Sequence, residues 1–386
     1  MPATCPPSAF EEIVFTDSIT AWAAAAEGTA AWWAGALRSG ATPVDVLTDA
    51  TKWWHAVSER GLPSWSTPHT IAFEASVARL RDFSTEPEAM IVPTLVLPPQ
   101  AGHDSCIVDY TSDQSQMATI IEAGLTRAFT LDWIGATPET RDLGIDDYLD
   151  VIARAVDYAG GRVNLVGDCQ GGWLATIYAA LHPEQVNTLT IAGAPIDFHS
   201  GEPVIHSALT WFAPGGDLSF YRALVAANGG VLPGESLLAG FIIIKPDNEV
   251  GRQVQLLANI NDEAYVARYR EFEDWFKHTQ AIPGAFYLWI VEHLFRDNEL
   301  IAGTLEVGGK HVNLAQISAP LFLLAGAADH ITPPAQVFAL ADYAGTPASQ
   351  VMRETAAGGH LGLFMGHEAL TNHWPALMRS VYERSV

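Results

Sequence analysis

Short apolar runs alternate with longer amphipathic segments between residues 89 and 198. Buried strands are predicted for four apolar runs, near 91–97, 127–132, 162–167 and 187–193. Helices are predicted for the segments near 113–123, 145–159 and 171–181. Because strands that alternate with helices build parallel sheets, the pattern predicts an α/β fold with a mostly parallel sheet and helices on both faces.

Three regions follow from the same pattern. Residues 1–88 are predicted to form a helical N-terminal region, and they contain half of the 12 tryptophans. This region is interpreted as a helical layer packed on the core, with a surface for polymer, lipid or a partner as the alternative. Residues 89–198 and 317–386 form the predicted core. Residues 199–316 form a predicted helical insertion, either a cap over the active site or a set of ordinary core aromatics.

Residues 163–172 combine a strand, a tight turn and the start of a helix around one cysteine. The segment reads Val-Asn-Leu-Val-Gly-Asp-Cys-Gln-Gly-Gly, which places Cys169 between Gly167 and Gly171. This is the pattern of a nucleophile elbow, in which small residues let the turn close and the central side chain projects at a helix N-terminus. The positive end of that helix favours a thiolate. The alternative is a buried structural cysteine beside a glycine-rich turn.

Two further residues follow in the order of the α/β-hydrolase triad. Asp329 follows the apolar run at 321–324 at its C-terminal end, and His360 lies in a glycine-rich loop after the next predicted strand. In this hypothesis His360 removes the proton of Cys169, and the thiolate attacks an acyl carbonyl. Asp329 orients His360 and stabilises its imidazolium. The same histidine then activates water or an alcohol. Taken singly, Asp329 could be a turn residue and His360 a structural loop histidine.

An oxyanion hole needs two hydrogen-bond donors close to the nucleophile. One is expected to be the backbone N–H of Gln170, which follows Cys169. The other is expected from the loop after the strand at 91–97, where Gln100, Ala101 and Gly102 are the candidates.

Three more residues are candidate substrate contacts: His103, Trp133 and His330. His103 could equally be a turn histidine, and Trp133 could equally belong to the core. His330 beside Asp329 could suggest a metal pair, but no third ligand stands at a suitable spacing. No dinucleotide-binding glycine motif, phosphate-binding loop or zinc-protease motif is present, so no metal or cofactor is expected.

These motifs resemble those of the polyhydroxyalkanoate synthases and intracellular polyhydroxybutyrate depolymerases, α/β-hydrolase relatives that use cysteine. The resemblance rests on the box at 167–172, on Asp-His-Ile-Thr-Pro at 329–333, and on segments at 131–133, 145–148, 193–198 and 305–309. It implies Cys169, Asp329 and His360 as catalytic residues. It also implies 3-hydroxyacyl-CoA thioesters or polyesters as substrates, and it leaves a homodimer or a partner subunit open.

Three functions remain after this step. In the first, an alcohol accepts the acyl group and the enzyme elongates a polyester, as the cysteine box and the Asp-His-Ile-Thr-Pro motif favour. In the second, water accepts it and the enzyme is a depolymerase, thioesterase or esterase, as the Gly-His-Leu-Gly segment at 359–362 suggests. The third is a non-catalytic, granule-binding protein of hydrolase fold, which the order of the triad argues against.

Charge and cysteine content exclude several classes of partner. The net charge of −24 argues against nucleic acid and anionic membranes. It also disfavours a polyanionic CoA thioester unless basic residues gather at the entrance. Cys5, Cys106 and Cys169 suggest no disulfide framework, so a cytoplasmic location, with or without granule association, is expected. Residues 21–37 are apolar but too short, with Glu27 among them, to predict a membrane span.

Overall fold

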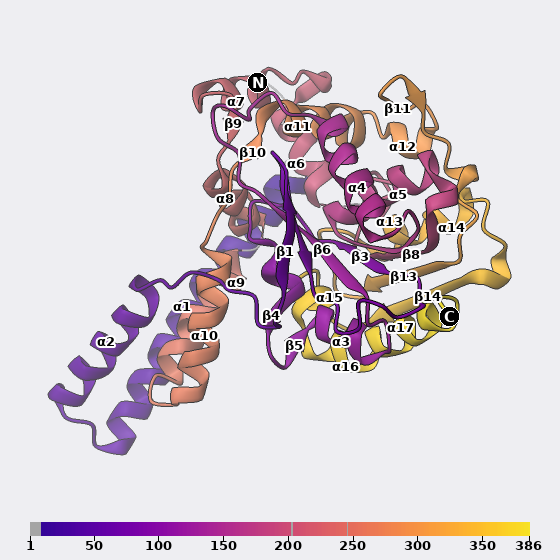
Figure 1. The fold of residues 1–386 in the computed structure, drawn as a ribbon. Coiled ribbons are helices and arrows are strands. Elements are labelled where there is room, and N and C mark those ends of the chain that lie inside the picture. The colour runs from indigo at the N-terminus through magenta and orange to yellow at the C-terminus, as the bar shows by residue number, and fades with distance from the viewer. Residues whose placement is uncertain (1–8, 202–203, 245) are drawn as a thin grey trace, which may run out of the picture. The chain divides into compact units, whose positions relative to one another are not determined.

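The computed structural model describes residues 9–201, 204–244 and 246–386. The chain folds into two compact units (Figure 1). One comprises residues 1–63 and 234–279, and the other comprises residues 64–233 and 280–386. The larger unit contains the β-sheet and every candidate site residue, and the smaller unit is helical.

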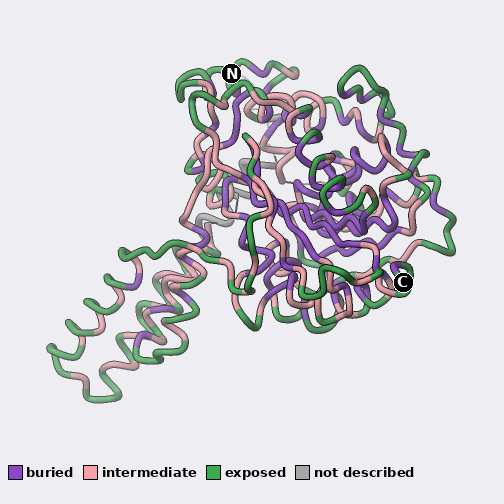
Figure 2. The backbone as a smooth tube through the Cα atoms, in the orientation of Figure 1, coloured by how far each residue is buried: buried purple, intermediate pink, exposed green. Residues whose placement is uncertain are grey.

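An eight-stranded sheet forms the centre of the larger unit. Its strand order is β1 (Thr70–Glu74), β2 (Ala78–Asp82), β6 (Ala128–Trp133), β3 (Thr94–Leu97), β7 (Val163–Asp168), β8 (Val186–Ala192), β13 (Leu321–Gly326) and β14 (Val351–Ala356). From β6 to β14 all neighbours are parallel, whereas β1 and β2 extend one edge by antiparallel pairing. β3, β6, β7, β8 and β13 are buried along their whole length (Figure 2), and their residues are mostly apolar, as is typical of parallel strands that are covered on both faces.

Helices cover both faces of this sheet (Figure 1). One face carries α4 (Ile145–Ala159), α5 (Gln170–Leu181) and α13 (Pro334–Phe338). The other carries α3 (Gln116–Glu122), α16 (His367–Asn372) and α17 (Trp374–Tyr382). The central helix α5 packs against β7 and β8, and all of its residues from Gln170 to Ala180 are buried. The sheet therefore holds α5, and the turn that precedes it, in the interior of the unit.

Part of the long insertion completes the larger unit. It forms α6 (Val204–Phe212), α7 (Ser219–Ala227), α11 (Gly284–Trp289), a π-helical segment (Ile290–Arg296) and α12 (Glu299–Ala302). Phe286 of α11 stacks on Tyr148 of α4, with ring centroids 3.8 Å apart and an interplanar angle of 9°. Its ring also lies 6.0 Å from that of Trp173 in α5. These aromatic contacts anchor the insertion to the helices beside the sheet.

The smaller unit consists of α1 (Ala9–Ser39), α2 (Pro43–Ser58), α8 (Gly234–Ile244), α9 (Pro246–Ala258) and α10 (Glu263–Phe276). Its core contains Ala56, Leu256, Ile260 and Tyr269, with Trp53 packed against them. At the start of α2, the Thr42 hydroxyl accepts from the N–H of Asp45, whose carboxylate accepts from the N–H of Thr42. This capping box fixes the sharp turn between the first two helices.

The sequence predicted the four central strands and three helices of the core to within about three residues of the observed bounds. The expectation of a helical region over residues 1–88 is wrong over β1 and β2. Thr70, Ile71 and Phe73 have high strand propensity, and β1 pairs with β2 in a hairpin that extends the sheet. Part of the predicted cap also belongs elsewhere, since residues 234–279 form one unit with residues 1–63.

Candidate active site

Cys169 occupies the turn between β7 and α5. Its backbone has φ 49° and ψ −117°, a conformation that L-residues rarely adopt. The N–H of Cys169 donates to the carbonyl of Ala192 at 2.9 Å, and its own carbonyl accepts from the N–H of Gly172 at 2.9 Å. These two hydrogen bonds hold the strained turn in place, as a nucleophile elbow requires.

The glycines around Cys169 are needed because backbones approach closely there. A Cβ on Gly171 would lie 1.9 Å from the carbonyl oxygen of Leu97, at the end of β3. A Cβ on Gly167 would lie 2.5 Å from the Cα of Gly172, and one on Gly172 would lie 2.3 Å from the Cβ of Ala194. The turn therefore packs directly against the loop after β3, which is the loop predicted to complete the oxyanion hole.

Asp329 and His360 come together from the ends of β13 and β14. The Nδ1 atom of His360 lies 2.7 Å from Oδ2 of Asp329, and both side chains are buried. The other carboxylate oxygen of Asp329 accepts from the N–H groups of Ile331 and Thr332, each at 2.9 Å. These bonds fix the carboxylate, so that Oδ2 faces the histidine ring.

The ring of His360 also interacts with Cys169. Burial alone would lower the pKa of His360, but the charges of Cys169 and Asp329 and hydrogen bonds with both side chains raise it well above its ordinary value. The ring of Phe364 packs edge-on against the imidazole with centroids 5.3 Å apart. His360 therefore lies between an acid and a thiol, in surroundings that favour its protonated form when Cys169 is a thiolate.

The predicted oxyanion donors lie on both sides of the elbow. Gln170 is the first residue of α5, where backbone N–H groups have no acceptor within the helix. No backbone hydrogen bond among the described residues uses the N–H of Gln100 either. The carbonyl of Gly102 accepts from the N–H of Gln280 at 2.7 Å, and that of Ala101 lies 3.2 Å from Nδ1 of His103. Both bonds hold the loop through its carbonyl groups.

The remaining candidate contacts differ in how far they are exposed. Trp133 is 1% exposed, and its indole N–H donates to the carbonyl of Pro98 at 2.8 Å. This bond ties the end of β6 to the loop after β3, so the ring supports the loop. His103 is buried, and His330 is half-buried beside Asp329.

One buried acid beside Cys169 was not assigned a role from the sequence. Asp168 precedes Cys169 and is completely buried at the end of β7. One of its oxygens lies 3.3 Å from Nε2 of Gln116 in α3, and the other has no hydrogen-bond partner among the described residues. Burial raises the pKa of Asp168 to about 8, against opposing effects of Gln116 and His360. An acidic residue at the end of a mostly apolar strand, directly before Cys169, is the sequence signal for this buried acid.

Three further features of the described part of the chain bear on function, namely its potential for a metal site, its potential for a membrane-spanning helix and its second cysteine. No group of three or more histidine, cysteine, aspartate or glutamate residues within it could hold a metal ion. No helix within it is long and apolar enough to cross a membrane. Cys106 is buried, and burial, followed by the charge of Asp104, raises the pKa of its thiol. Cys5 lies outside the described residues.

Comparison with known proteins gives one family and several relatives. Residues 75–369 match the family model described as "Protein of unknown function (DUF3141)". The poly(3-hydroxyalkanoate) polymerase subunit PhaC of Haloferax mediterranei is 29% identical over 329 residues, which are 83% of this chain and 64% of the relative. The subunit of the same name from Allochromatium vinosum is 28% identical over 306 residues, covering 77% and 82%. The chain thus spans slightly less than two thirds of the first of these relatives.

A solved structure agrees with the observed architecture. A carboxylesterase of the thaumarchaeon Nitrososphaera gargenis covers 82% of this chain and 98% of its own, with a TM-score of 0.50 and 15% identity. The likeness at this identity concerns the fold alone. Together with the sheet order and the helices on both faces, it shows that the chain has the α/β-hydrolase fold, as the sequence predicted.

Proposed function

The chain belongs to the DUF3141 family, and we propose that it transfers 3-hydroxyacyl groups through a covalent intermediate on Cys169, elongating a polyester. The observation that carries this proposal is the arrangement of Cys169 at a strained turn beside His360, which is in turn hydrogen-bonded to Asp329. A thiol, a base and an orienting acid in this order are the parts that nucleophilic acyl transfer needs.

In the first half of the reaction His360 holds the proton of Cys169, and the thiolate attacks the carbonyl of a 3-hydroxyacyl thioester. The N–H groups of Gln170 and of the Gln100 loop stabilise the developing oxyanion. The C–S bond to CoA then breaks, and the leaving thiolate takes the proton from His360. The product of this half-reaction is an acyl-thioester on Cys169, with His360 neutral and able to act as a base.

In the second half-reaction an acceptor hydroxyl gives its proton to His360 and attacks the acyl group on Cys169. The new ester bond forms as the Cys169 thiolate leaves, which regenerates the starting ion pair. When the acceptor is the 3-hydroxyl of a growing chain, the polyester lengthens by one unit. The names of the polymerase relatives from Haloferax mediterranei and Allochromatium vinosum support this choice of substrate and acceptor.

One observation favours a neutral ester over a CoA thioester as the substrate, and with it the hydrolytic alternative in which water is the acceptor. The net charge of −24 repels a polyanionic CoA thioester over long distances, whereas a neutral polyester or simple ester meets no such barrier. The same cysteine, histidine and acid would then act in a depolymerase or esterase.

The experiment that tests the proposal is product analysis with 3-hydroxybutyryl-CoA. CoA release and product chain length are measured together, with Cys169→Ala as the control. Oligomers or polymer alongside CoA support transfer to an alcohol. Free 3-hydroxybutyrate alone shows hydrolysis and contradicts the synthase proposal, and turnover by Cys169→Ala contradicts the role of Cys169. If no CoA is released, amorphous polyester and simple acyl esters are the next substrates to test for the hydrolytic alternative.

A further inference from the structure

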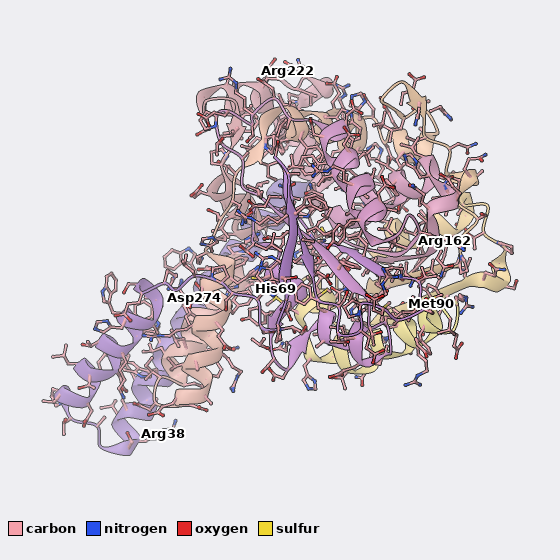
Figure 3. All side chains as sticks on the ribbon, in the orientation of Figure 1. Arg38, His69, Met90, Arg162, Arg222 and Asp274 are labelled. Carbon is pink, nitrogen blue, oxygen red and sulfur yellow. The ribbon has the colours of Figure 1, made fainter. Side chains whose placement is uncertain are left out.

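The first helix of the smaller unit presents an apolar stripe to solvent. Trp22 is 78% exposed, Trp33 is 46% exposed and Leu37 is 78% exposed. At 3.6 residues per turn these three residues share one side of α1 with Ala26, Thr29 and Ala30, which are also exposed. Together the six residues are called the α1 stripe. The α1 stripe contains no ionisable side chain. Arg38, labelled in Figure 3, lies in the last turn of α1, directly after the stripe.

The opposite side of α1 is already occupied within its own unit. Ala21 is buried, and a Cβ on Gly28 would lie 1.8 Å from Cγ1 of Val254 in α9. The α1 stripe is therefore not the face that holds the helix in its unit. The ring of Trp33 also packs edge-on against that of the half-buried Trp32, with centroids 4.8 Å apart. This contact holds Trp33 in one orientation while much of its ring remains exposed.

We propose that the α1 stripe pairs antiparallel with the same stripe of a second copy, about a twofold axis that passes between Thr29 and Ala30. In this register Trp22 faces Leu37 of the second copy, and Ala26 faces Trp33 of the second copy. The order of large and small residues is self-complementary, because each exposed Trp33 meets a small side chain. Every contact then occurs twice, as in the isologous interfaces of twofold dimers.

The area available fits such a pairing. A buried tryptophan removes about 150–250 Å² from solvent, so the exposed parts of Trp22 and Trp33 contribute roughly 370–620 Å² over two copies. Leu37 and the alanines bring the total toward the ~1,000 Å² that a specific interface needs. The stripe spans 16 residues, about 24 Å of helix, and its alanines let two helix axes approach closely.

Charge argues against the main competing occupant. An anionic membrane surface attracts basic segments, whereas this chain has a net charge of −24 and α1 carries Arg38 as its basic residue. A second copy needs no opposite charge along the contact, because the paired stripes are themselves uncharged. The proposal does not depend on the acyl-transfer reaction, since the stripe lies in the unit without the candidate site.

The test is the mass of the full chain in solution, measured by sedimentation equilibrium over a wide range of concentration. We expect a monomer–dimer equilibrium for the wild-type chain and monomer for Trp33→Glu and for Leu37→Glu. Trp54→Glu is the matched control, because Trp54 is 63% exposed on the neighbouring helix α2 and outside the stripe. It should dimerise like the wild type, and circular dichroism checks that each variant is folded.

A monomeric wild-type chain at all concentrations overturns the proposal, as does a dimer that survives both stripe substitutions or dissociates only with Trp54→Glu.

Cross-linking tests the register independently in a Cys5→Ser background. Thr29→Cys lies near the axis and should form a disulfide dimer under mild oxidation. Trp22→Cys should not, because the two copies of position 22 lie about 22 Å apart along the axis. Efficient cross-linking at position 22 indicates parallel pairing and contradicts the proposed register.

Discussion

The Nδ1 atom of His360 lies 2.7 Å from Oδ2 of Asp329, and the Asp329 carboxylate is held by two further backbone N–H groups. The orientation of the Asp329 carboxylate is therefore fixed by backbone hydrogen bonds that do not involve His360. This relationship assigns Nδ1 as the ring nitrogen bound to the acid and leaves Nε2 for Cys169. The chemistry proposed for the site depends on that orientation.

Replacing Asp329 should disable the site without unfolding the protein. Asp329→Asn keeps the shape of the side chain but removes the charge that stabilises the imidazolium. We expect kcat to fall by on the order of 10²–10⁴, with a smaller effect on KM. Asp342→Asn is the matched control, because Asp342 is exposed in the same unit. Full activity of Asp329→Asn in steady-state assays would rule out an orienting role.

Alkylation should distinguish the two cysteines of the described chain. Cys169 should react rapidly with iodoacetamide and lose activity in parallel, because His360 stabilises its thiolate. Cys106 should remain unmodified, since burial raises the pKa of its thiol. Peptide mass spectrometry after a short exposure measures both. His360→Gln should slow the reaction at Cys169, and an unchanged rate would show that the histidine does not activate the thiol.

The elbow should not tolerate even one added methyl group at Gly171. In Gly171→Ala the new Cβ would meet the carbonyl oxygen of Leu97 at 1.9 Å, so the β3 loop or the elbow must move. We expect loss of most activity and a free energy of unfolding lower by about 1–3 kcal/mol. Gly362→Ala is the control, because a Cβ there meets no atom within 4 Å. Equal activity of the two variants in the same assay would contradict the close approach.

Asp168 should make stability depend on pH. Burial raises the pKa of Asp168 from 3.8 to about 8, so the folded chain keeps a proton that the unfolded chain loses between these values. The free energy of unfolding should therefore fall as pH rises from about 4 to 8. Asp168→Asn removes this dependence, so its gain in melting temperature over the wild type should be larger at pH 8 than at pH 4. A gain independent of pH would contradict a protonated, buried Asp168.

The sequence predicted those features whose place in the fold is reflected in the residue types of one short segment. The buried parallel strands appear as apolar runs, and Gly167, Cys169 and Gly171 mark a turn that only small residues can form. The positions of Asp329 and His360 after their strands follow because parallel strands end at one edge of the sheet. These signals do not require knowledge of long-range contacts.

The rest depends on contacts that no local pattern encodes. β1 and β2 are short, so the strand propensity of residues such as Ile71 and Phe73 does not by itself predict them, and they form strands because β6 offers an edge for antiparallel pairing. The grouping of residues 234–279 with residues 1–63 depends on the packing of Ala56 against Leu256 and Tyr269. Ala56 and Leu256 are about 200 residues apart in the sequence. The structural role of Trp133 depends on its hydrogen bond to Pro98, which the sequence does not reveal.

The most direct test of the account is to trap the acyl-enzyme. The purified chain is mixed with 3-hydroxybutyryl-CoA, quenched in acid within the first turnover, digested and analysed by mass spectrometry. The account predicts a 3-hydroxybutyryl group on the peptide that contains Cys169, formed at the rate of CoA release and absent from Cys169→Ala. CoA release without an adduct on Cys169, or with an adduct on another residue, would contradict the central claim that Cys169 is the nucleophile.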